Sequence, residues 1–364
     1  MSYQIDHKKI ADALQFPTEE IVDIVIDTDA YNEVDDQFAI AWALRSPERV
    51  NVEAVYAAPF CSQAIGKMLA PPGQKPPRLT REMLGDGIHF ADTPAEGMEL
   101  SYQEILNLFS LLDISPEGKV FRGSTAYIED DPGRKPVESE AARDLVKRAM
   151  ARPSGKRLYV LAIGAITNVA SALMMEPAIA EKITVVWLGG HAPYFQDGKE
   201  FNLLQDVLAA QHLFNCGVPL VLVPCAGVAD HLTVTAPELE TCLMGRSKVG
   251  DYLGKIVLDA LKPSKAFKGM MKGYTGGMDD IPAELCGKFP TTHMARSRII
   301  WDISTVGYVM NPNWTVSSLT AAPILNDDMT WAHDESRHPI RLCYGLSRDP
   351  MFGDLFAKLE QSGK

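Results

Sequence analysis

Cysteine and long hydrophobic runs are scarce in this sequence. Its 364 residues include six cysteines, scattered with no CxxC pair, a pattern that indicates a reducing compartment. No apolar run approaches the roughly 18 residues that are needed to span a bilayer, so a transmembrane helix is excluded. The chain starts without the basic and apolar segments of a secretion signal. We therefore expect a cytoplasmic protein.

Positive charge is also in short supply. The 35 Lys and Arg residues are outnumbered by 47 Asp and Glu residues, which gives a formal net charge of −12 and a pI near 5.2. Because nucleic acids and anionic membranes are themselves negative, this balance argues against either as the main partner. A small neutral or cationic ligand is easier to accommodate.

The composition shows no break and no internal repeat that would divide the chain. A hydrophobic content of 46% is enough for a large core. Short apolar runs alternate with helix-length patterns, which predicts a single α/β domain over residues 1–364 with a mostly parallel central sheet flanked by helices. The predicted strands are 21–26, 51–57, 157–163, 183–188, 218–223 and 339–344. The predicted helices are 35–45, 102–113, 138–151, 167–175, 203–214, 247–261 and 303–310.

Two stretches interrupt this alternation and are predicted to be insertions. Residues 59–98 contain two proline-rich pieces, so we expect an irregular excursion over the edge of the sheet. Residues 262–298 contain a glycine-rich segment, which is compatible with a lid over a site and equally with an ordinary surface loop. Ser101 with Glu104 has the spacing of a capping box, which predicts the start of the helix at 102.

Four carboxylates gather where the first predicted strand ends and a helix begins. They belong to Asp27, Asp29, Asp35 and Asp36. Like charges at this spacing cannot all stay ionised at neutral pH unless a proton or a hard metal ion lies between them. The helix dipole contributes too little, on the order of 0.3–1 kcal/mol. Because parallel sheets bind ligands just outside the carboxyl ends of their strands, we expect a calcium site here.

Three alternatives to this calcium site differ in what they require of the sequence. A helix cap followed by a solvated loop needs only that aspartate favours the N-cap. An EF-hand is excluded, because the sixth position counted from Asp27 is Asn32 instead of glycine and the twelfth is Phe38 instead of glutamate. A haloacid-dehalogenase-like phosphatase would use Asp27 as nucleophile, Asp29 as acid and magnesium as partner, and needs a distant lysine and a further acidic pair.

Four motifs, in order, resemble those of the inosine-uridine preferring nucleoside hydrolase family. The first is the aspartate cluster, and the second is the run 163–170, similar to the Gly-x-x-Thr-Asn segment of that family. The third is a Gly-Gly pair followed by Glu200-Phe201-Asn202, and the fourth is Asp302, similar to the aspartate of a late His-Asp pair. The resemblance implies an open α/β fold and calcium-dependent cleavage of the N-glycosidic bond of ribonucleosides. It also implies a possible homo-oligomer, a dimer or a tetramer.

The resemblance implies a metal site with oxygen ligands only. Asp29, Asp36 and Asp302 would supply carboxylates to calcium, and the backbone carbonyl of Ile163 would add a neutral oxygen. Asp27 would orient these ligands from behind. Cleavage of a ribosyl C1′–N bond passes through an oxocarbenium-like transition state, and Asp29 would take the proton of the attacking water.

The resemblance also implies contacts to the substrate. Asp35 would hydrogen-bond the ribose hydroxyls, while Glu200 and Asn202 would hold the sugar from the other side. Before the late aspartate this chain has Trp301 where many relatives have a histidine, so no imidazole acid stands there. Tryptophan is similar to the residue of the purine-preferring branch and would stack on a purine, contributing roughly 1–3 kcal/mol. A core aromatic is the alternative interpretation of Trp301.

The chain departs from the family pattern in two further places. The loop between Asp29 and Asp35 is longer by two residues, so Asn32 or Glu33 is a candidate for reading a substrate group. No asparagine lies between Gly190 and Glu200, and His191 or Tyr194 is the candidate that replaces it, with a surface role as the alternative. These departures leave open a non-catalytic, calcium-dependent nucleoside- or ribose-binding protein as an alternative to a hydrolase.

Overall fold

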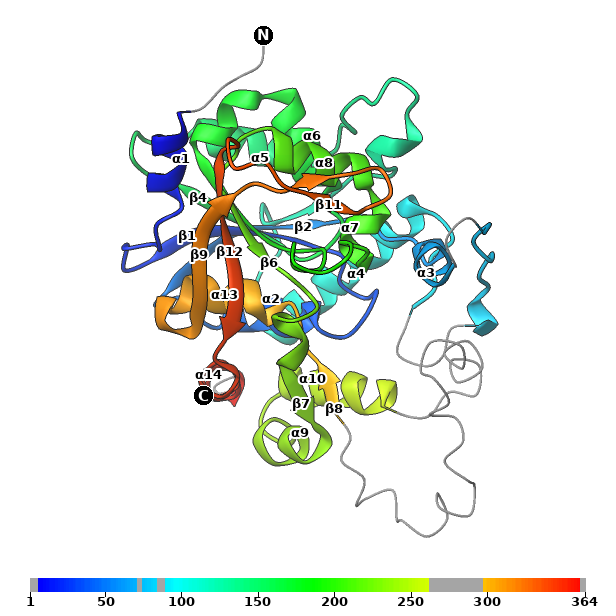
Figure 1. The fold of residues 1–364 in the computed structure, drawn as a ribbon. Helices are drawn as coiled ribbons and strands as arrows, with labels where there is room; N and C mark the ends of the chain where they lie inside the picture. The colour runs from blue at the N-terminus through cyan, green and yellow to red at the C-terminus, as the bar shows by residue number, and fades with distance from the viewer. Residues whose placement is uncertain (1–5, 71–73, 84–88, 262–296, 361–364) are drawn as a thin grey trace.

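A mostly parallel sheet of eight strands forms the centre of the molecule (Figure 1). The computed structural model describes residues 6–70, 74–83, 89–261 and 297–360. The strand order is β3-β2-β1-β4-β5-β6-β12-β9, and every neighbouring pair is parallel except β12 and β9. The predicted fold class is therefore confirmed. The strands are β1 Val22–Thr28, β2 Val50–Ala57, β3 Val120–Arg122, β4 Leu158–Ala162, β5 Ile183–Leu188, β6 Leu220–Val223, β9 Thr315–Ala321 and β12 Pro339–Leu346.

The central strands are apolar along their whole length because both faces of the sheet are covered. In β1, the side chains of Ile24, Val25 and Ile26 are all completely buried, although successive residues point to opposite faces. Residues 183–188 of β5 are likewise buried throughout. Continuous apolar runs of this kind are typical of parallel strands between two helical layers. The six predicted strands are all present, with ends that differ by at most two residues.

Helices cover both faces of the sheet. On one face lie α5 (Glu140–Met150), α6 (Thr167–Met175) and α8 (Val207–Asn215), which pack in that order. On the other lie α2 (Asp36–Leu44), α4 (Pro94–Leu111) and α13 (Ile303–Met310) (Figure 1). Smaller elements complete the described chain: α1 His7–Ala13, α3 Gln63–Leu69, α7 Phe201–Gln205, α9 Ala236–Cys242, α10 Lys248–Ala260, α14 Arg348–Glu360, and the short strands β7 Thr233–Thr235, β8 Ser297–Ile299, β10 Ile324–Leu325 and β11 Trp331–Ala332.

The predicted capping box at Ser101 and Glu104 is wrong. Helix α4 begins earlier, at Pro94, and its N-cap is Thr93, whose side chain accepts a hydrogen bond from the backbone N–H of Glu96. Proline at the first helical position suits a start here, because its missing N–H would be unsatisfied anyway. The Ser101 hydroxyl instead donates to the backbone carbonyl of Thr28, 2.9 Å away, and so ties α4 to the end of β1.

Two other predictions of local structure need correction. The predicted helix 203–214 is two helices, α7 and α8, which are separated at Asp206; the carboxylate of Asp206 accepts from the backbone N–H of Ala209 and caps α8. Residues 59–98 are not irregular throughout, because they contain α3 and the first turn of α4. The glycine-rich part of the predicted 262–298 insertion lies outside the described residues, and residues 297 and 298 belong to β8.

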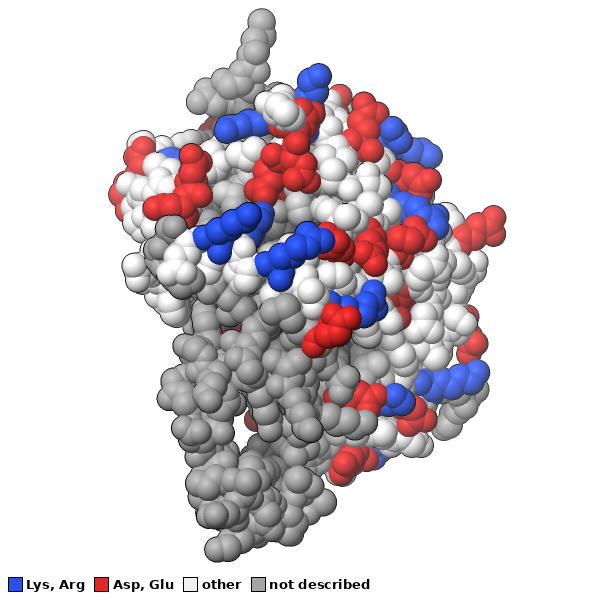
Figure 2. Space-filling model, turned by 90° about the vertical axis from the view of Figure 1, so that its right-hand side faces the viewer, with Lys and Arg blue, Asp and Glu red and all other residues white. Residues whose placement is uncertain are grey.

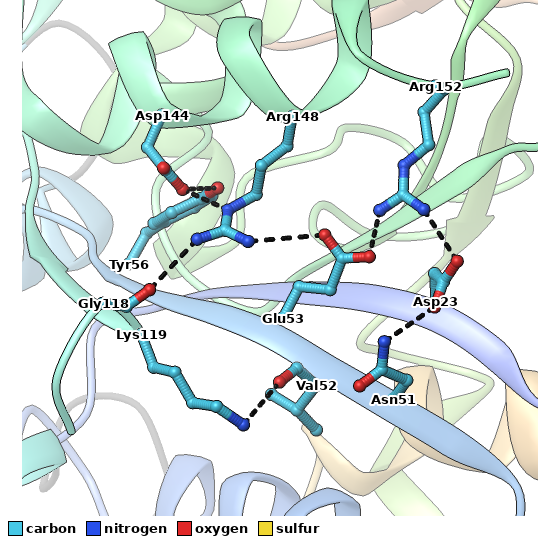
Figure 3. A network of polar contacts seen from close by, with 10 residues as sticks. All are labelled: Asp23, Asn51, Val52, Glu53, Tyr56, Gly118, Lys119, Asp144, Arg148 and Arg152. Carbon is cyan, nitrogen blue, oxygen red and sulfur yellow. Dashed lines mark hydrogen bonds and ion pairs between the residues drawn. The ribbon is translucent and has the colours of Figure 1, made fainter. Parts of the chain in front are cut away.

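Charged groups at the amino ends of β1 and β2 neutralise one another. Arg152 binds Asp23 at 2.7 Å and also pairs with Glu53, while Arg148 donates to Asp144 at 2.5 Å and reaches Glu53 at 3.4 Å (Figure 3). The face of the molecule drawn in Figure 2 likewise shows basic and acidic side chains interspersed. In the part of the chain that the structure describes, no helix is both long and apolar enough to cross a membrane.

Candidate metal and substrate site

The strand order reverses between β1 and β4. From β1 the chain continues to β2 and β3 on one side, whereas β4 is followed by β5 and β6 on the other. Ligands of open α/β sheets bind at such a switch point, outside the carboxyl ends of the strands. A cavity of about 330 Å³ opens there. Its lining is Asp29, Asn32, Glu33, Asp35, Asp36, Met68, Ile163, Leu188, His191, Lys199, Glu200, Phe201, Asn202, Cys225, Trp301 and Asp302.

Two helix N-termini bring three carboxylates together in this cavity. Asp35 and Asp36 stand at the start of α2, and Asp302 stands at the N-cap position of α13, which packs against α2. Carboxylate oxygens of the three residues lie within 4.8 Å of one another, and all three residues are buried. Residues that are 266 positions apart in sequence (302 minus 36) therefore share one site.

The electrostatics of this group favour a bound proton or a cation between the carboxylates. Burial, followed by repulsion from Glu33, raises the pKa of Asp35 to about 7, and Arg298 opposes the shift. Burial and the neighbouring carboxylates hold the pKa of Asp36 and of Asp302 well above the ordinary aspartate value. A hard divalent cation would relieve this repulsion, and a donor set made only of oxygens suits calcium. The residues present thus fit the expected metal.

Asp29 lies just outside this group of three, at the end of β1. Burial, together with repulsion from Asp36 and Asp35, raises the pKa of its carboxyl group. Its Oδ2 is 3.4 Å from the Nδ2 of Asn32, which donates to it. On the β4 side only glycine fits at position 164, because a Cβ there would come within 2.9 Å of Asp29 Oδ1. Asp29 is thereby fixed between the two strands of the switch point.

The opposite wall of the cavity is organised by α7. Glu200 is the N-cap of that helix, and its carboxylate accepts from the backbone N–H groups of Gly190 at 2.7 Å and Asn202 at 3.0 Å. The Asn202 Nδ2 donates to the carbonyls of Leu188 at 3.0 Å and Ile163 at 3.3 Å. The amide oxygen of Asn202 therefore remains as an acceptor for a ligand, whereas Glu200 is largely committed to the backbone.

Asp27 does not face the cavity. It is completely buried within β1, and its Oδ1 accepts from the Nδ2 of Asn168 at 2.8 Å. Burial raises its pKa to about 7, and the hydrogen bond from Asn168 opposes that shift. A side chain in this position cannot attack a substrate, which removes the basis for the phosphatase alternative with Asp27 as nucleophile.

The family whose sequence model is described as inosine-uridine preferring nucleoside hydrolase matches residues 73–342. The chain belongs to this family. The aspartate cluster at residues 27–36 precedes the matched range, and the structure joins it to Asp302 within that range. Family membership places the chain among hydrolases that act on N-glycosyl compounds.

Curated relatives and solved structures of the nucleoside hydrolase family are similar to the chain. Probable uridine nucleosidase 2 of Arabidopsis thaliana is 27% identical over 64% of this chain and 68% of its own length. Pyrimidine-specific ribonucleoside hydrolase RihB of Shigella flexneri is 25% identical over 50% of each chain. The chain therefore spans about half the length of the bacterial relative. The structure of the purine-preferring ribonucleoside hydrolase from Gardnerella vaginalis superimposes with a TM-score of 0.61, 17% identity and coverage of 93% and 98%.

Trp301 and His191 also line the cavity of this nucleoside hydrolase. The half-buried indole of Trp301 packs against the hydrophobic core and also lines the cavity next to Asp302. Burial lowers the pKa of His191. The Nδ1 of His191 accepts from the backbone N–H of Ala226 at 3.4 Å, so its proton belongs on Nε2. A neutral imidazole of this kind can donate a hydrogen bond but is a weak source of protons.

Sequence reasoning missed several residues of the site. Lys199 and Cys225 line the cavity, and Arg298 forms an ion pair with Glu33 at its wall. Lys199 directly precedes Glu200, so its position in the chain was a usable signal. Cys225 follows β6, the next strand beyond β5, and is near the same sheet edge. Arg298 belongs to the short strand pair β7–β8, which has too few residues to show a periodic pattern.

Proposed function

We propose that this protein hydrolyses the N-glycosidic bond of purine ribonucleosides in a calcium-dependent reaction. The observation that carries the proposal is the buried group of Asp35, Asp36 and Asp302 in one cavity with Asp29 and Trp301. The three carboxylates would bind a divalent cation, and the cavity gives space for a ligand. The carboxylate of Asp29 suits the ribose end of a ribosyl–base bond, and the indole of Trp301 suits the base end.

Calcium would be held by Asp29, Asp36 and Asp302 with the carbonyl of Ile163, and Asp35 would bind the sugar hydroxyls. When bound, the ion would supply positive charge that makes a nearby water more acidic and attracts the oxygens of a ribose. Asp29 accepts the proton of the water that attacks C1′. This role needs an ionised Asp29, which the added positive charge favours.

The remaining carboxylates favour the cationic sugar of the transition state. Positive charge develops on the ribose as the C1′–N bond breaks, and fixed negative groups around the cavity stabilise it electrostatically. The free amide oxygen of Asn202 and the Nε2–H of His191 are suitable partners for other sugar hydroxyls. Asp27 accepts a hydrogen bond from Asn168, and this contact holds the end of β1 in place behind the cavity.

Trp301 supports a purine as the leaving base. Its bicyclic indole offers a flat surface next to the metal group, and stacking on such a ring contributes roughly 1–3 kcal/mol per base. Among the described residues that line the cavity, His191 is the imidazole and it is neutral, so the departing base would take its proton from solvent. The free thiols of the described cysteines, Cys61, Cys216, Cys225, Cys242 and Cys343, fit the expected cytoplasmic location.

Turnover of a panel of ribonucleosides with and without a calcium chelator tests the proposal. The panel contains inosine, guanosine, adenosine, uridine and cytidine, and release of reducing sugar is measured. We expect purine nucleosides to release ribose only when calcium is present. Calcium-dependent binding with no ribose release would identify a non-catalytic nucleoside-binding protein instead. Faster release from uridine than from every purine would contradict the purine preference.

A further inference from the structure

One residue of the cavity lining, Glu33, takes part in an ion pair. Glu33, in the loop between Asp29 and α2, lines the cavity and pairs with Arg298 of β8. The side chains are 30% and 24% exposed, so each keeps contact with solvent. The guanidinium carbon of Arg298 lies 5.5 Å from the ring centroid of Trp301. Arg298 therefore contacts two residues of the cavity lining, Glu33 and Trp301, from outside that lining.

Glu33 belongs to the lining of the cavity and is close enough to the other acidic groups to affect them. Burial is the main cause of the raised pKa of Asp35, Glu200 and Cys225, and repulsion from Glu33 adds to each of these shifts. Arg298 pairs with Glu33 and supplies a compensating positive charge. Glu33 belongs to the cavity lining, whereas Arg298 lies outside it. Glu33 and Trp301 thus share the lining of the cavity, and Arg298 contacts both of them.

A carboxylate in this setting selects for hydrogen-bond donors. It has about four lone-pair sites and no proton to donate, and Arg298 uses only part of that capacity. Guanine carries two adjacent N–H donors, at N1 and the 2-amino group, which match the two oxygens of a carboxylate. Hypoxanthine has only the N1 donor, and adenine presents an acceptor at N1 that a carboxylate repels.

We propose that Glu33, held in place by Arg298, reads the Watson–Crick edge of the base and selects guanine-type nucleosides. This rests on the proposed function, because it assumes that the base lies against Trp301. The two residues that lengthen the first loop relative to the family pattern then have a use: they bring a carboxylate to the base. An ion pair that merely closed the loop would not distinguish one base from another.

Equilibrium binding of two C-nucleosides tests the proposal without turnover. In 9-deazaguanosine and 9-deazainosine the base is bonded to the sugar through carbon, so neither can be hydrolysed, and they differ only in the 2-amino group. Titration calorimetry with the full chain in calcium-containing buffer should show that 9-deazaguanosine binds roughly tenfold more tightly. Equal affinities, or tighter binding of 9-deazainosine, would overturn the proposal.

The variant Glu33→Gln identifies the residue responsible. An amide presents one acceptor and one donor, which suits the N1–H and O6 of hypoxanthine, so the preference should disappear or reverse. Glu240→Gln, on the exposed side of α9, is the matched control and should retain the tenfold ratio. An unchanged ratio in Glu33→Gln would remove Glu33 from base recognition, whether or not the protein hydrolyses nucleosides.

Arg298 is a positioning residue in this scheme, because it acts through Glu33. Arg298→Lys keeps the positive charge beside the carboxylate and should keep most of the preference, although a single ammonium replaces the guanidinium fork. Arg298→Met keeps an unbranched side chain without the charge or the guanidinium donors and should lose the preference. If the methionine variant folds with a normal melting temperature and retains the tenfold ratio, Arg298 has no part in recognition.

Discussion

The backbone of Gly164 leaves no room for a side chain, because Asp29 occupies the space. A Cβ at residue 164 would lie 2.9 Å from the Oδ1 of Asp29 and 3.0 Å from its backbone nitrogen. The contact joins the ends of β1 and β4, the two strands at the switch point of the sheet. The position of the proposed catalytic carboxylate therefore depends on the absence of a methyl group on the neighbouring strand.

Gly164→Ala should displace Asp29 and reduce turnover much more than stability. Overpacking of a close contact costs typically 1–3 kcal/mol in folding free energy, whereas a displacement of a catalytic group by about 1 Å reduces turnover on the order of a hundredfold. Ribose release and thermal unfolding of the same preparation check this. Gly353→Ala, where an added Cβ meets nothing within 4 Å, is the control. Normal turnover in Gly164→Ala would show that Asp29 tolerates the shift.

Asp29→Asn should fold and bind calcium but lose turnover by several orders of magnitude. The amide keeps the size of the side chain and one oxygen, but it cannot accept the proton of the attacking water. Steady-state kcat and a calcium titration should be measured together. Asp12→Asn, on the exposed surface of α1, controls for loss of one negative charge. A kcat close to that of the natural protein would assign the base role to another residue.

Local sequence patterns predicted the sheet well because its strands are buried on both faces. The runs at 21–26 and 183–188 are apolar at nearly every position, so neither could be confused with a surface strand or an amphipathic helix. β9 was missed, since it is the antiparallel edge strand and residues 316–320 are largely exposed and polar. The start of α4 was missed because Ser101 and Glu104 imitate a cap while making tertiary hydrogen bonds to Thr28 and Tyr252.

The position of the candidate residues was predictable where they follow the end of a strand, and less so where their partners come from other parts of the chain. Asp29 follows β1 immediately, and Asp35 and Asp36 stand where the loop after β1 enters α2, so the strand-to-helix pattern places them at the carboxyl edge of the sheet. Arg298 gave no such signal: it approaches Glu33 only through the folding of β7 against β8. The role of Glu200 as a helix cap also depends on tertiary structure, because the cap includes the N–H of Gly190, ten residues away.

Removal of calcium should make the stability of the protein strongly dependent on pH. Burial raises the pKa of Asp35 to about 7, above the ordinary aspartate value. A group with a raised pKa in the folded state contributes stability that is complete below the unfolded pKa, near 4, and is lost as the pH rises to about 7. In chelator, the melting temperature should therefore fall between pH 4 and pH 7.

Added calcium should reverse this loss at neutral pH, because the ion binds the ionised carboxylates of the folded state. At a free concentration one hundred times the dissociation constant, the gain is about 2.7 kcal/mol. Melting curves in calcium and in chelator at pH 5 and pH 7 provide the comparison, with magnesium as the second cation. If calcium raised the melting temperature as much at pH 5 as at pH 7, this would argue against calcium binding through the carboxylates whose pKa is raised.

Asn168 is expected to be a stability residue that acts at a distance from the cavity. Its Nδ2 donates to Asp27 at 2.8 Å and to the carbonyl of Ala57 at 3.2 Å, while its Oδ1 accepts from the backbone N–H and the hydroxyl of Ser124. Asn168→Ala leaves these buried groups without partners, which should cost on the order of 3 kcal/mol of unfolding free energy.

An exposed asparagine with the same kind of partner separates burial from hydrogen bonding in this test. Asn51 donates from Nδ2 to Asp23 at 2.8 Å, but the pair is exposed to water at the amino end of the sheet (Figure 3). Asn51→Ala should cost less than about 0.5 kcal/mol, because water replaces the lost partner. Urea unfolding of both variants gives the two free energies. If the two variants lost equal amounts of unfolding free energy, the buried hydrogen bonds of Asn168 would not stabilise the fold. The orientation of Asp27 would then not depend on them either.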